Sequence, residues 1–428
     1  LLDLCASEMA DDNVAALVTE IALTETADNQ HAIRRGQLLV PRMTQPKLAP
    51  STGFSSRADG CYLVTGGLGK LGRQVARWLA EHGAQQIVLV SRRQPDKEAL
   101  AFIESIEQSG CQVVIHAADV GDRDDVESLF GRFGDDLKNL AGVIHAAGVL
   151  DDGLLESQTN ERFEQVLKPK VAGADLLNEL TQDLEIDLFV LYSSAASVLG
   201  SPGQSNYATG NAYLDGLAYR RRQLGRPAIT INWGPWTEGM ADDERVVKRL
   251  AVQGITPLEG NDAHAALEQM LASNTVQATV MDVDWRRMRT GPNGDVPAIL
   301  QELVGAGKKS RAADSALVSK LKQLRGNAQR ELLVKTIQDS LQGILSTPDV
   351  PDTDRPLIEM GLDSLMAVEF GTELQQMLGD QFNFGPTMLF DHPTITAITD
   401  FVLDLVTSDD SNDSPTVNSQ PAVPGSAD

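Results

Sequence analysis

Short runs of apolar residues recur along the first two thirds of the chain, and segments with helical periodicity separate them. A buried strand is predicted at 62–65, where a Gly-Gly pair stops it, and a helix at 70–82. Five further strand-like runs follow, at 86–90, 112–117, 142–145, 187–193 and 228–233. Continuous apolar strands that alternate with helices are typical of a parallel sheet covered on both faces. We therefore predict an α/β fold, a doubly wound parallel sheet, over residues 49–305.

The pattern changes after residue 305. Residues 306–327 are rich in Lys, Arg, Gly, Ala and Ser, which indicates a hydrated linker or a loosely attached helix. Helical segments separated by proline-containing loops then predict a small helix bundle over 328–406, with helices near 328–345, 364–378 and 394–406. Residues 407–428 are rich in Ser, Asp, Asn and Pro and are expected to form a disordered tail or linker.

Composition limits the classes of partner. The 428 residues include 42% hydrophobic positions, enough for ordinary globular cores in roughly two or three domains. The net charge of −24 comes from 36 Lys and Arg against 60 Asp and Glu, which argues against nucleic acid and anionic membranes as partners. No apolar run approaches the ~20 residues that span a bilayer. Cys5, Cys61 and Cys111 show neither metal-site nor disulfide spacing, so we expect no metal and a reducing, cytoplasmic setting.

A glycine-rich turn joins the first predicted strand to the first predicted helix. Gly67, Gly69 and Gly72 have the G-x-G-x-x-G spacing, with Thr65 and Leu68 inside the same turn. Such glycines permit a tight turn and close approach of the backbone to a pyrophosphate, which the helix N-terminus attracts. We expect all five residues to border a dinucleotide; a purely structural turn is the alternative.

The ends of the next two strands bear on which dinucleotide binds. Ser91 and Arg92 end the second strand, where a binder of NAD usually has an acidic residue. An arginine suits the 2′-phosphate of NADPH instead, although a solvated loop remains the alternative. Asp119 and Val120 end the third strand, where a carboxylate suits an adenine amino group or, equally, a helix N-cap.

Small residues follow the fourth strand. Ala146, Ala147 and Gly148 would let the backbone lie against the cofactor. His145, directly before them, is expected to be a packed structural histidine rather than an acid or base.

Polar residues after the fifth strand suit the reduction of a carbonyl group. Ser194 ends that strand, and Tyr207 and Asn211 are i,i+4 neighbours on the next helix. Hydride addition builds charge on oxygen, so the site needs a donor to polarise the carbonyl and an acid to protonate the alkoxide. A phenol serves as that acid only beside a cation, for which Lys170 is the candidate.

These motifs resemble the ketoreductase domains of modular type I polyketide synthases, a Rossmann-fold branch of the short-chain dehydrogenases/reductases. The resemblance covers about 60–305, and 1–48 resembles the end of that family's N-terminal structural subdomain. It implies NADPH-dependent reduction of a β-ketoacyl thioester, with Tyr207 as proton donor and Ser194 as carbonyl-binding hydroxyl. Lys170 and Asn211 would complete the tetrad; many short-chain enzymes have the lysine where this chain has Asn211.

A serine in the helical unit suggests how the substrate is held. The run Gly-Leu-Asp-Ser-Leu over 361–365 resembles the attachment signature of acyl carrier proteins, which implies 4′-phosphopantetheine on Ser364. A helix-capping serine is the alternative. The resemblance implies an acyl thioester substrate, a phosphopantetheinyl transferase and other domains of the same synthase as partners. The rival interpretation is a redox-inactive scaffold and carrier.

The same resemblance suggests a stereochemical outcome. Leu150, Asp151 and Asp152 form a Leu-Asp-Asp motif, which in this family indicates the D-configured alcohol. The opposite class has Trp eight residues before the catalytic tyrosine, where this chain has Leu199. A solvated turn that caps the next helix is the alternative for the two aspartates.

Overall fold

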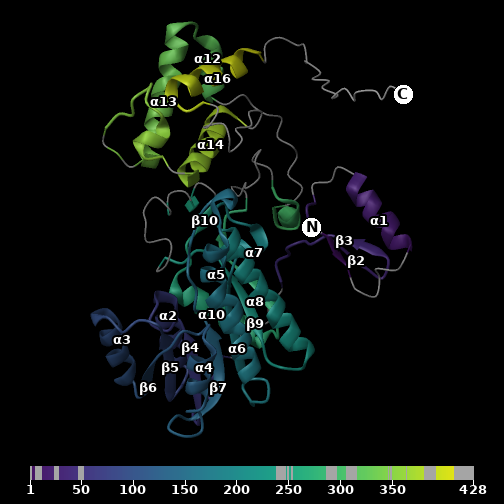
Figure 1. Ribbon diagram of the computed structural model, residues 1–428, viewed down its shortest axis with the longest axis vertical. Helices are drawn as coiled ribbons and strands as arrows, with labels where there is room; N and C mark the ends of the chain where they lie inside the picture. The colour runs from purple at the N-terminus through teal and green to yellow at the C-terminus, as the bar shows by residue number, and fades with distance from the viewer. Residues whose placement is uncertain are drawn as a thin grey trace, which may run out of the picture. The chain divides into compact units, whose positions relative to one another are not determined.

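The computed structural model forms two compact units, 1–290 with 296–306 and 291–295 with 307–428 (Figure 1). It describes residues 2–4, 12–23, 28–46, 53–237, 247, 250–251, 254–285, 296–304, 316–345, 347, 349–362, 364–379 and 392–408. None of the helices within these ranges is both long enough and apolar enough to cross a bilayer.

The first unit is built on a seven-stranded sheet in the order β11-β9-β8-β7-β4-β5-β6. All neighbouring strands in it are parallel, which confirms the predicted doubly wound α/β fold. The strands are β4 Gly60–Thr65, β5 Gln86–Ser91, β6 Gln112–Ala117, β7 Asn139–His145, β8 Leu188–Ser194, β9 Ile229–Trp233 and β11 Gln277–Val280. The sequence analysis missed β11, a four-residue edge strand whose side chains are all only partly buried.

Helices cover both faces of the sheet, and alternate strand residues point into two separate cores. Tyr62 and Val64 of β4 pack toward α2 Lys70–Glu81, α3 Lys97–Glu107 and α10 Gly260–Ala272. Cys61 and Leu63 pack toward α4 Arg123–Phe130, α6 Gly173–Leu180 and α8 Ser205–Gln223. Burial on both faces explains why these strands are apolar at every position.

The order of the strands reverses beside β4. The chain continues from β4 to β5 on one side, whereas β7 and β8 lie on the other. At such a switch point the connections leave in opposite directions, which opens a crevice beyond the carboxyl ends of the strands. Thr65 and His145, paired across β4 and β7, mark this crevice.

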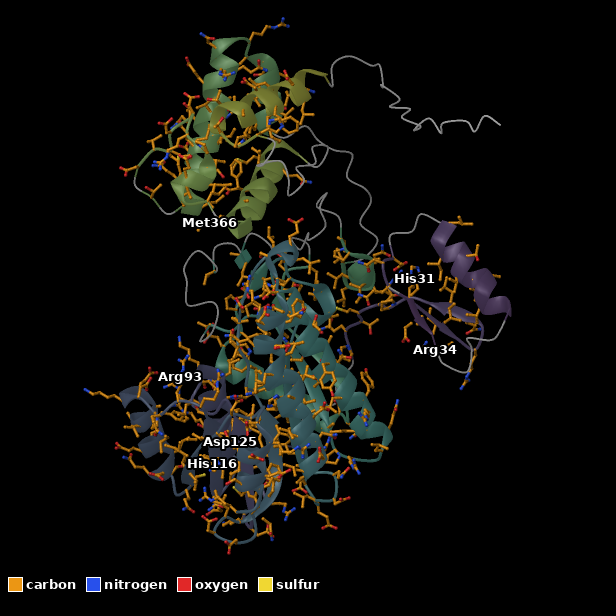
Figure 2. The ribbon with its side chains drawn as sticks, in the orientation of Figure 1. His31, Arg34, Arg93, His116, Asp125 and Met366 are labelled. Atoms are coloured by element: carbon orange, nitrogen blue, oxygen red, sulfur yellow. The ribbon has the colours of Figure 1, made fainter. Side chains whose placement is uncertain are left out.

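A smaller sheet lies at the N-terminus. Strand β1 Leu2–Leu4 is parallel to β2 His31–Arg34, which is antiparallel to β3 Gln37–Leu39, and α1 Asp12–Leu23 connects the first two. Figure 2 labels Arg34 of β2, whose guanidinium pairs with the carboxylate of Asp3. The Met43 amide donates to the Ile299 carbonyl at 2.7 Å, beside η5 Ala298–Leu300 and α11 Gln301–Val304. A two-stranded ladder pairs β10 Ile255–Thr256 with β12 Asp282–Val283.

The second unit is a helix bundle with its own core. Its helices are α12 Ala316–Gln323, α13 Asn327–Leu345, η6 Leu357–Met360, α14 Ser364–Leu378, which carries Met366 (Figure 2), and α16 Ile395–Ser408. The segment 306–327, predicted as a linker or loose helix, includes α12, whose Val318 and Leu321 are fully buried in this core. The predicted disordered tail lies outside the described residues after Ser408.

Helix α8 is anchored at its C-terminal end by a buried arginine. Arg221 is 1% exposed, and its guanidinium carbon lies 3.7 Å from the centroid of the Phe189 ring. Its N–H groups donate to Thr181 Oγ1 at 2.9 Å, to Asn178 Oδ1 at 3.0 Å and to the Pro227 carbonyl at 3.3 Å. The guanidinium therefore joins α8 to α6 and to the start of β9.

We expect Arg221→Met to lower the free energy of unfolding by about 2–3 kcal/mol, because it leaves buried acceptors unpaired and removes the cation–π contact. The neighbouring Arg220 is exposed, so Arg220→Met should stay within about 0.5 kcal/mol of the parent. Urea titration followed by tryptophan fluorescence tests this, since all four tryptophans lie in the first unit. Equal effects of the two substitutions would contradict the expectation.

Candidate active site at the switch point of the sheet

The glycine-rich turn leaves no space for side chains. Gly66 has a φ of +68°, and a Cβ added to Gly72 would lie 2.2 Å from the Gly66 carbonyl oxygen. A Cβ on Gly67 would lie 2.8 Å from Leu89 Cβ of the adjacent strand. Gly69 caps α2 without a side-chain hydrogen bond, and the start of a helix attracts an anion through its positive potential.

A buried histidine joins three elements next to this turn. His145 is fully buried, with Nε2 3.0 Å from the Pro169 carbonyl oxygen and Nδ1 2.7 Å from Thr65 Oγ1. A carbonyl only accepts, so Nε2 carries the proton and Nδ1 accepts from Thr65, whose oxygen accepts from the Ala147 amide at 3.3 Å. Burial, with a smaller effect of the Lys170 charge, lowers the pKa of His145 to about 3. The geometry is that of a structural histidine.

Lys170 lies on a π-helical turn. The run from α5 Asn160–Leu167 to α6 is continuous, but its middle, η3 Lys168–Ala172, is wider than an α-helix, and the Gly173 amide donates to the Lys168 carbonyl. Such turns often occur at functional sites. Here the turn directs Lys170 inward, where its Nζ donates to the Tyr192 carbonyl at 2.7 Å.

Two glycines make room for the lysine side chain. A Cβ on Gly210 would lie 3.1 Å from Lys170 Cβ, and one on Gly148 would lie 3.0 Å from Lys170 Cε. Gly148, predicted to border the cofactor, therefore also packs against the lysine. The Lys170 Nζ is 5.8 Å from the centroid of the Tyr207 ring. Burial lowers the pKa of Lys170 to about 8, against a raising effect of Asp215.

Ser194, Tyr207 and Asn211 come together as their spacing predicts. Ser194 is the last residue of β8, and the other two lie one turn apart in α8. Burial raises the pKa of Tyr207, whereas hydrogen bonds with the Ser194 and Asn211 side chains act to lower it. Asn211 is fully buried; its Nδ2 donates to the Tyr207 carbonyl at 2.8 Å and its Oδ1 has no protein partner.

A buried polar network between α8 and β9 lies next to these residues, and the sequence analysis missed it. The Asp215 carboxylate accepts from Thr230 Oγ1 at 2.7 Å, Ser197 Oγ at 2.7 Å and Asn232 Nδ2 at 2.8 Å. Asn232 also donates to Ser193 Oγ at 3.0 Å. One signal was available: Asp215 lies four residues after Asn211 and eight after Tyr207, on the same helix face.

The residues predicted to select the dinucleotide lie at the ends of β5 and β6. The Asp119 carboxylate accepts from Lys168 Nζ at 2.8 Å and from the Gly121 amide at 3.0 Å. Burial acts to raise the pKa of Asp119, but Lys168, this amide and Arg92 outweigh it and lower the pKa overall. Arg92 is exposed, as is Arg93 beside it (Figure 2).

The other residues predicted to bind the cofactor lie at strand ends and in the glycine-rich turn. Ser91 Oγ accepts from the Arg93 amide at 3.2 Å. Val120 is buried against Gly173, where an added Cβ would lie 3.0 Å from Val120 Cγ1. The partly buried side chains of Leu68 and Ala146 pack on the core that includes α2.

The predicted stereocontrol residues fall in two places. Leu150 is 44% exposed, and Asp151 and Asp152 follow it in a loop before η2 Leu155–Ser157. Leu199 ends the short helix α7 Ala196–Leu199 and packs on a different cluster, which includes Ile255 and Leu300.

Ser364 is the first residue of α14, as predicted, and follows a 3-10 turn that ends at Gly361 with φ +96°. The side chain of Ser364 lies outside the part of the structure that is described. Only its position at the start of a helix is therefore established.

The chain matches two known families. Residues 60–238 match the KR domain family, and residues 335–402 match the phosphopantetheine attachment site family. Polyketide synthase GfsA of Streptomyces halstedii is 36% identical over 387 residues, which cover 88% of this chain and 5% of GfsA. The chain thus spans a small part of the length of this relative.

Solved structures of similar proteins agree with the match to the KR domain family. One titled as A-type ketoreductases from a modular polyketide synthase is 38% identical, with a TM-score of 0.65 over 71% of this chain and 64% of that one. The PlmKR1 ketoreductase from the first module of phoslactomycin biosynthesis in Streptomyces sp. HK803 is 35% identical, with a TM-score of 0.65 over 72% of each chain.

Proposed function

The chain belongs to the ketoreductases of modular polyketide synthases, and an acyl carrier domain follows the reductase domain in the sequence. From this we propose that the chain reduces a β-ketoacyl thioester to the β-hydroxyacyl thioester with NADPH. One observation carries the proposal: a buried lysine, a tyrosine, a serine and an asparagine converge at the switch point of a dinucleotide-binding sheet. The carrier would hold the acyl chain on 4′-phosphopantetheine. A phosphopantetheinyl transferase and other domains of the same synthase would be its partners.

The glycine-rich turn supports a dinucleotide as cofactor. Gly67 and Gly72 let the turn pack against Leu89 and the Gly66 carbonyl, and α2 begins without a side-chain cap, which suits a pyrophosphate at the helix start. Arg92 is an exposed cation directly after β5, which favours a cofactor with a 2′-phosphate. When bound, NADPH supplies the hydride that adds to the β-carbon.

The four converging side chains have complementary roles in this proposal. Ser194 and Tyr207 donate hydrogen bonds to the β-carbonyl oxygen, and Tyr207 transfers its proton to that oxygen as the C–O bond becomes single. The Lys170 ammonium stabilises the phenolate that remains. Asn211, with its unpartnered Oδ1 beside Tyr207, offers an acceptor that would hold a water molecule, and that water would return a proton to the phenolate.

Two further points complete the proposal. The Leu-Asp-Asp motif at 150–152 favours the D-configured alcohol, because the side from which the substrate enters decides which carbonyl face meets the hydride. The alternative of a redox-inactive scaffold does not account for the convergence of Lys170, Ser194, Tyr207 and Asn211.

We expect Tyr207→Phe to retain NADPH binding and to lower the turnover of a soluble β-ketothioester by at least about a hundredfold, the lower end of general-acid contributions. Binding is followed by NADPH fluorescence and turnover by NADPH absorbance. The exposed Tyr219 of α8 provides the matched control, Tyr219→Phe, which should behave as the parent. Parental turnover by Tyr207→Phe would favour the scaffold.

The pH profile of the parent provides a second measure of the same site. The pKa of Lys170 is about 8 in the folded chain, so its ammonium is present below that pH and lost above it. Turnover should therefore fall as the pH rises through about 8. A profile flat from pH 7 to pH 10 would argue against a role for this charge.

We expect Arg92→Ala to lower the ratio of kcat/KM for NADPH to that for NADH by roughly ten- to a hundredfold, because a charge-assisted contact with the 2′-phosphate is lost. Arg123 provides a control, since its guanidinium is engaged by Glu127 and Glu179. Arg123→Ala should keep the parental ratio. An unchanged ratio in Arg92→Ala would remove Arg92 from the cofactor site.

We expect Ser364→Ala to abolish the gain of the phosphopantetheine mass on incubation with coenzyme A and a phosphopantetheinyl transferase. Reduction of a soluble β-ketothioester should stay near the parental rate, because the two units have separate cores. Thr353→Ala, which removes another hydroxyl from the same unit, should be modified as the parent is. A persisting mass gain in Ser364→Ala would place the attachment elsewhere.

A further inference from the structure

Arg162, the third residue of α5, holds the loop that carries the Leu-Asp-Asp motif. Its Nε donates to Asp151 Oδ2 at 2.9 Å and its Nη2 to Asp151 Oδ1 at 2.6 Å, a bidentate pair. Nη2 also donates to the Asp152 carbonyl at 2.7 Å, and Nη1 to the Ser157 carbonyl at 3.1 Å. Both carboxylate oxygens of Asp151 are therefore turned toward α5.

Gly153 lies directly against this guanidinium. A Cβ added to Gly153 would lie 2.7 Å from Arg162 Nη1 and 2.9 Å from Nη2. The two residues thus pack with no space for even a methyl group between them. Arg162 and Asp151 are each about three-quarters buried, so water competes little with their contact.

The opposite side of the loop contacts the segment that leads into Tyr207. Three hydrogen bonds cross this contact: the Gly153 amide to the Gly203 carbonyl at 2.8 Å, Gln204 Nε2 to Asp152 Oδ2 at 3.0 Å, and Asn206 Nδ2 to the Asp151 carbonyl at 2.8 Å. Tyr207 is the next residue in the chain. A shift of the loop is therefore transmitted to the residues directly before Tyr207.

We propose that Arg162 is a positioning residue that sets the stereochemical outcome by holding the 151–153 loop against 203–206. The proposal rests on the reductase function proposed above and assigns the two aspartates different parts. Asp151 serves as the anchor for Arg162, whereas Asp152, bound through its side chain to Gln204, lies between the loop and the start of α8. The motif then acts through the position of its loop.

The planar guanidinium is what this geometry requires. Five donors in a fixed fork reach one carboxylate and two carbonyls together, which the single ammonium of lysine cannot do. Arg162→Lys should therefore keep the charge and lose most of the positioning. Gly153→Ala tests the same contact from the other side, because its methyl group displaces the end of a flexible side chain and leaves the core of the sheet intact.

The experiment measures the ratio of D- to L-β-hydroxy thioester made by the full chain from a soluble β-ketothioester with NADPH, by chiral chromatography. We expect Arg162→Met and Gly153→Ala to shift this ratio at least about tenfold toward the alcohol that the parent makes less, since misplacement by about 1 Å has effects of this size or larger. Arg162→Lys should shift it in the same direction. A ratio does not depend on the fraction of folded enzyme, so a loss of stability alone leaves it unchanged.

Arg132→Met is the matched control, because Arg132 makes a bidentate pair with Asp136 and contacts His116 of the edge strand β6, which β5 and β4 separate from β7 and the 151–153 loop that follows it. It should give the parental ratio. If the parent reduces the substrate but Arg162→Met and Gly153→Ala both give the parental ratio, the positioning role of Arg162 is overturned and the proposed function stands. A parent that does not oxidise NADPH with this substrate would instead overturn the proposed function, and the inference with it.

Discussion

Lys170 carries an ammonium group into the protein interior, where removing it from water costs several kcal/mol unless other groups replace that water. The Tyr192 carbonyl accepts one of its N–H groups, Gly148 and Gly210 leave a path for its methylene groups, and the Asp215 carboxylate favours its charge. The His145 contact with the Pro169 carbonyl fixes the turn from which the side chain starts. Much of the polar structure around the crevice can be understood as accommodating this one charge beside Tyr207.

Helix α8 connects this charge with the rest of the unit. Tyr207, Asn211 and Asp215 lie on one face of the helix, and Arg221 anchors its far end to α6 and to the start of β9. A long helix fixed at its far end thus helps to keep the Tyr207 phenol beside Ser194 and Asn211. In contrast, the loop at 151–153 has no apolar core of its own, so its position depends on hydrogen bonds to the two elements beside it.

Local pattern was sufficient to predict most of the fold. Six of the seven strands of the large sheet, the glycine turn and the i,i+4 pair of Tyr207 and Asn211 all depend on residues close in sequence. Strand β11 was missed because its side chains lie at a sheet edge and are only partly buried, which weakens the apolar signal. The sequence left 306–327 open between a linker and a loosely attached helix, because the two buried residues of α12, Val318 and Leu321, stand among lysines and small residues. Periodicity places Asp215 on the helix face of Asn211 but reports neither its hydrogen bonds with Thr230, Ser197 and Asn232 nor the contact of Arg162 with Gly153, because both depend on how loops and strands pack.

The π-helical turn at 168–172 makes the helical run 160–180 sensitive to its length. A π turn is in effect an α-helix that contains one additional residue, and each residue of an α-helix advances by about 100° around the axis. Losing a single residue here would let the turn relax to regular α-helix, with the flanking contacts of α5 and α6 kept. The ammonium group would then no longer point at Tyr192. The fold would then persist without the charge beside the phenol, so any function that needs this charge depends on helix register as well as on residue identity.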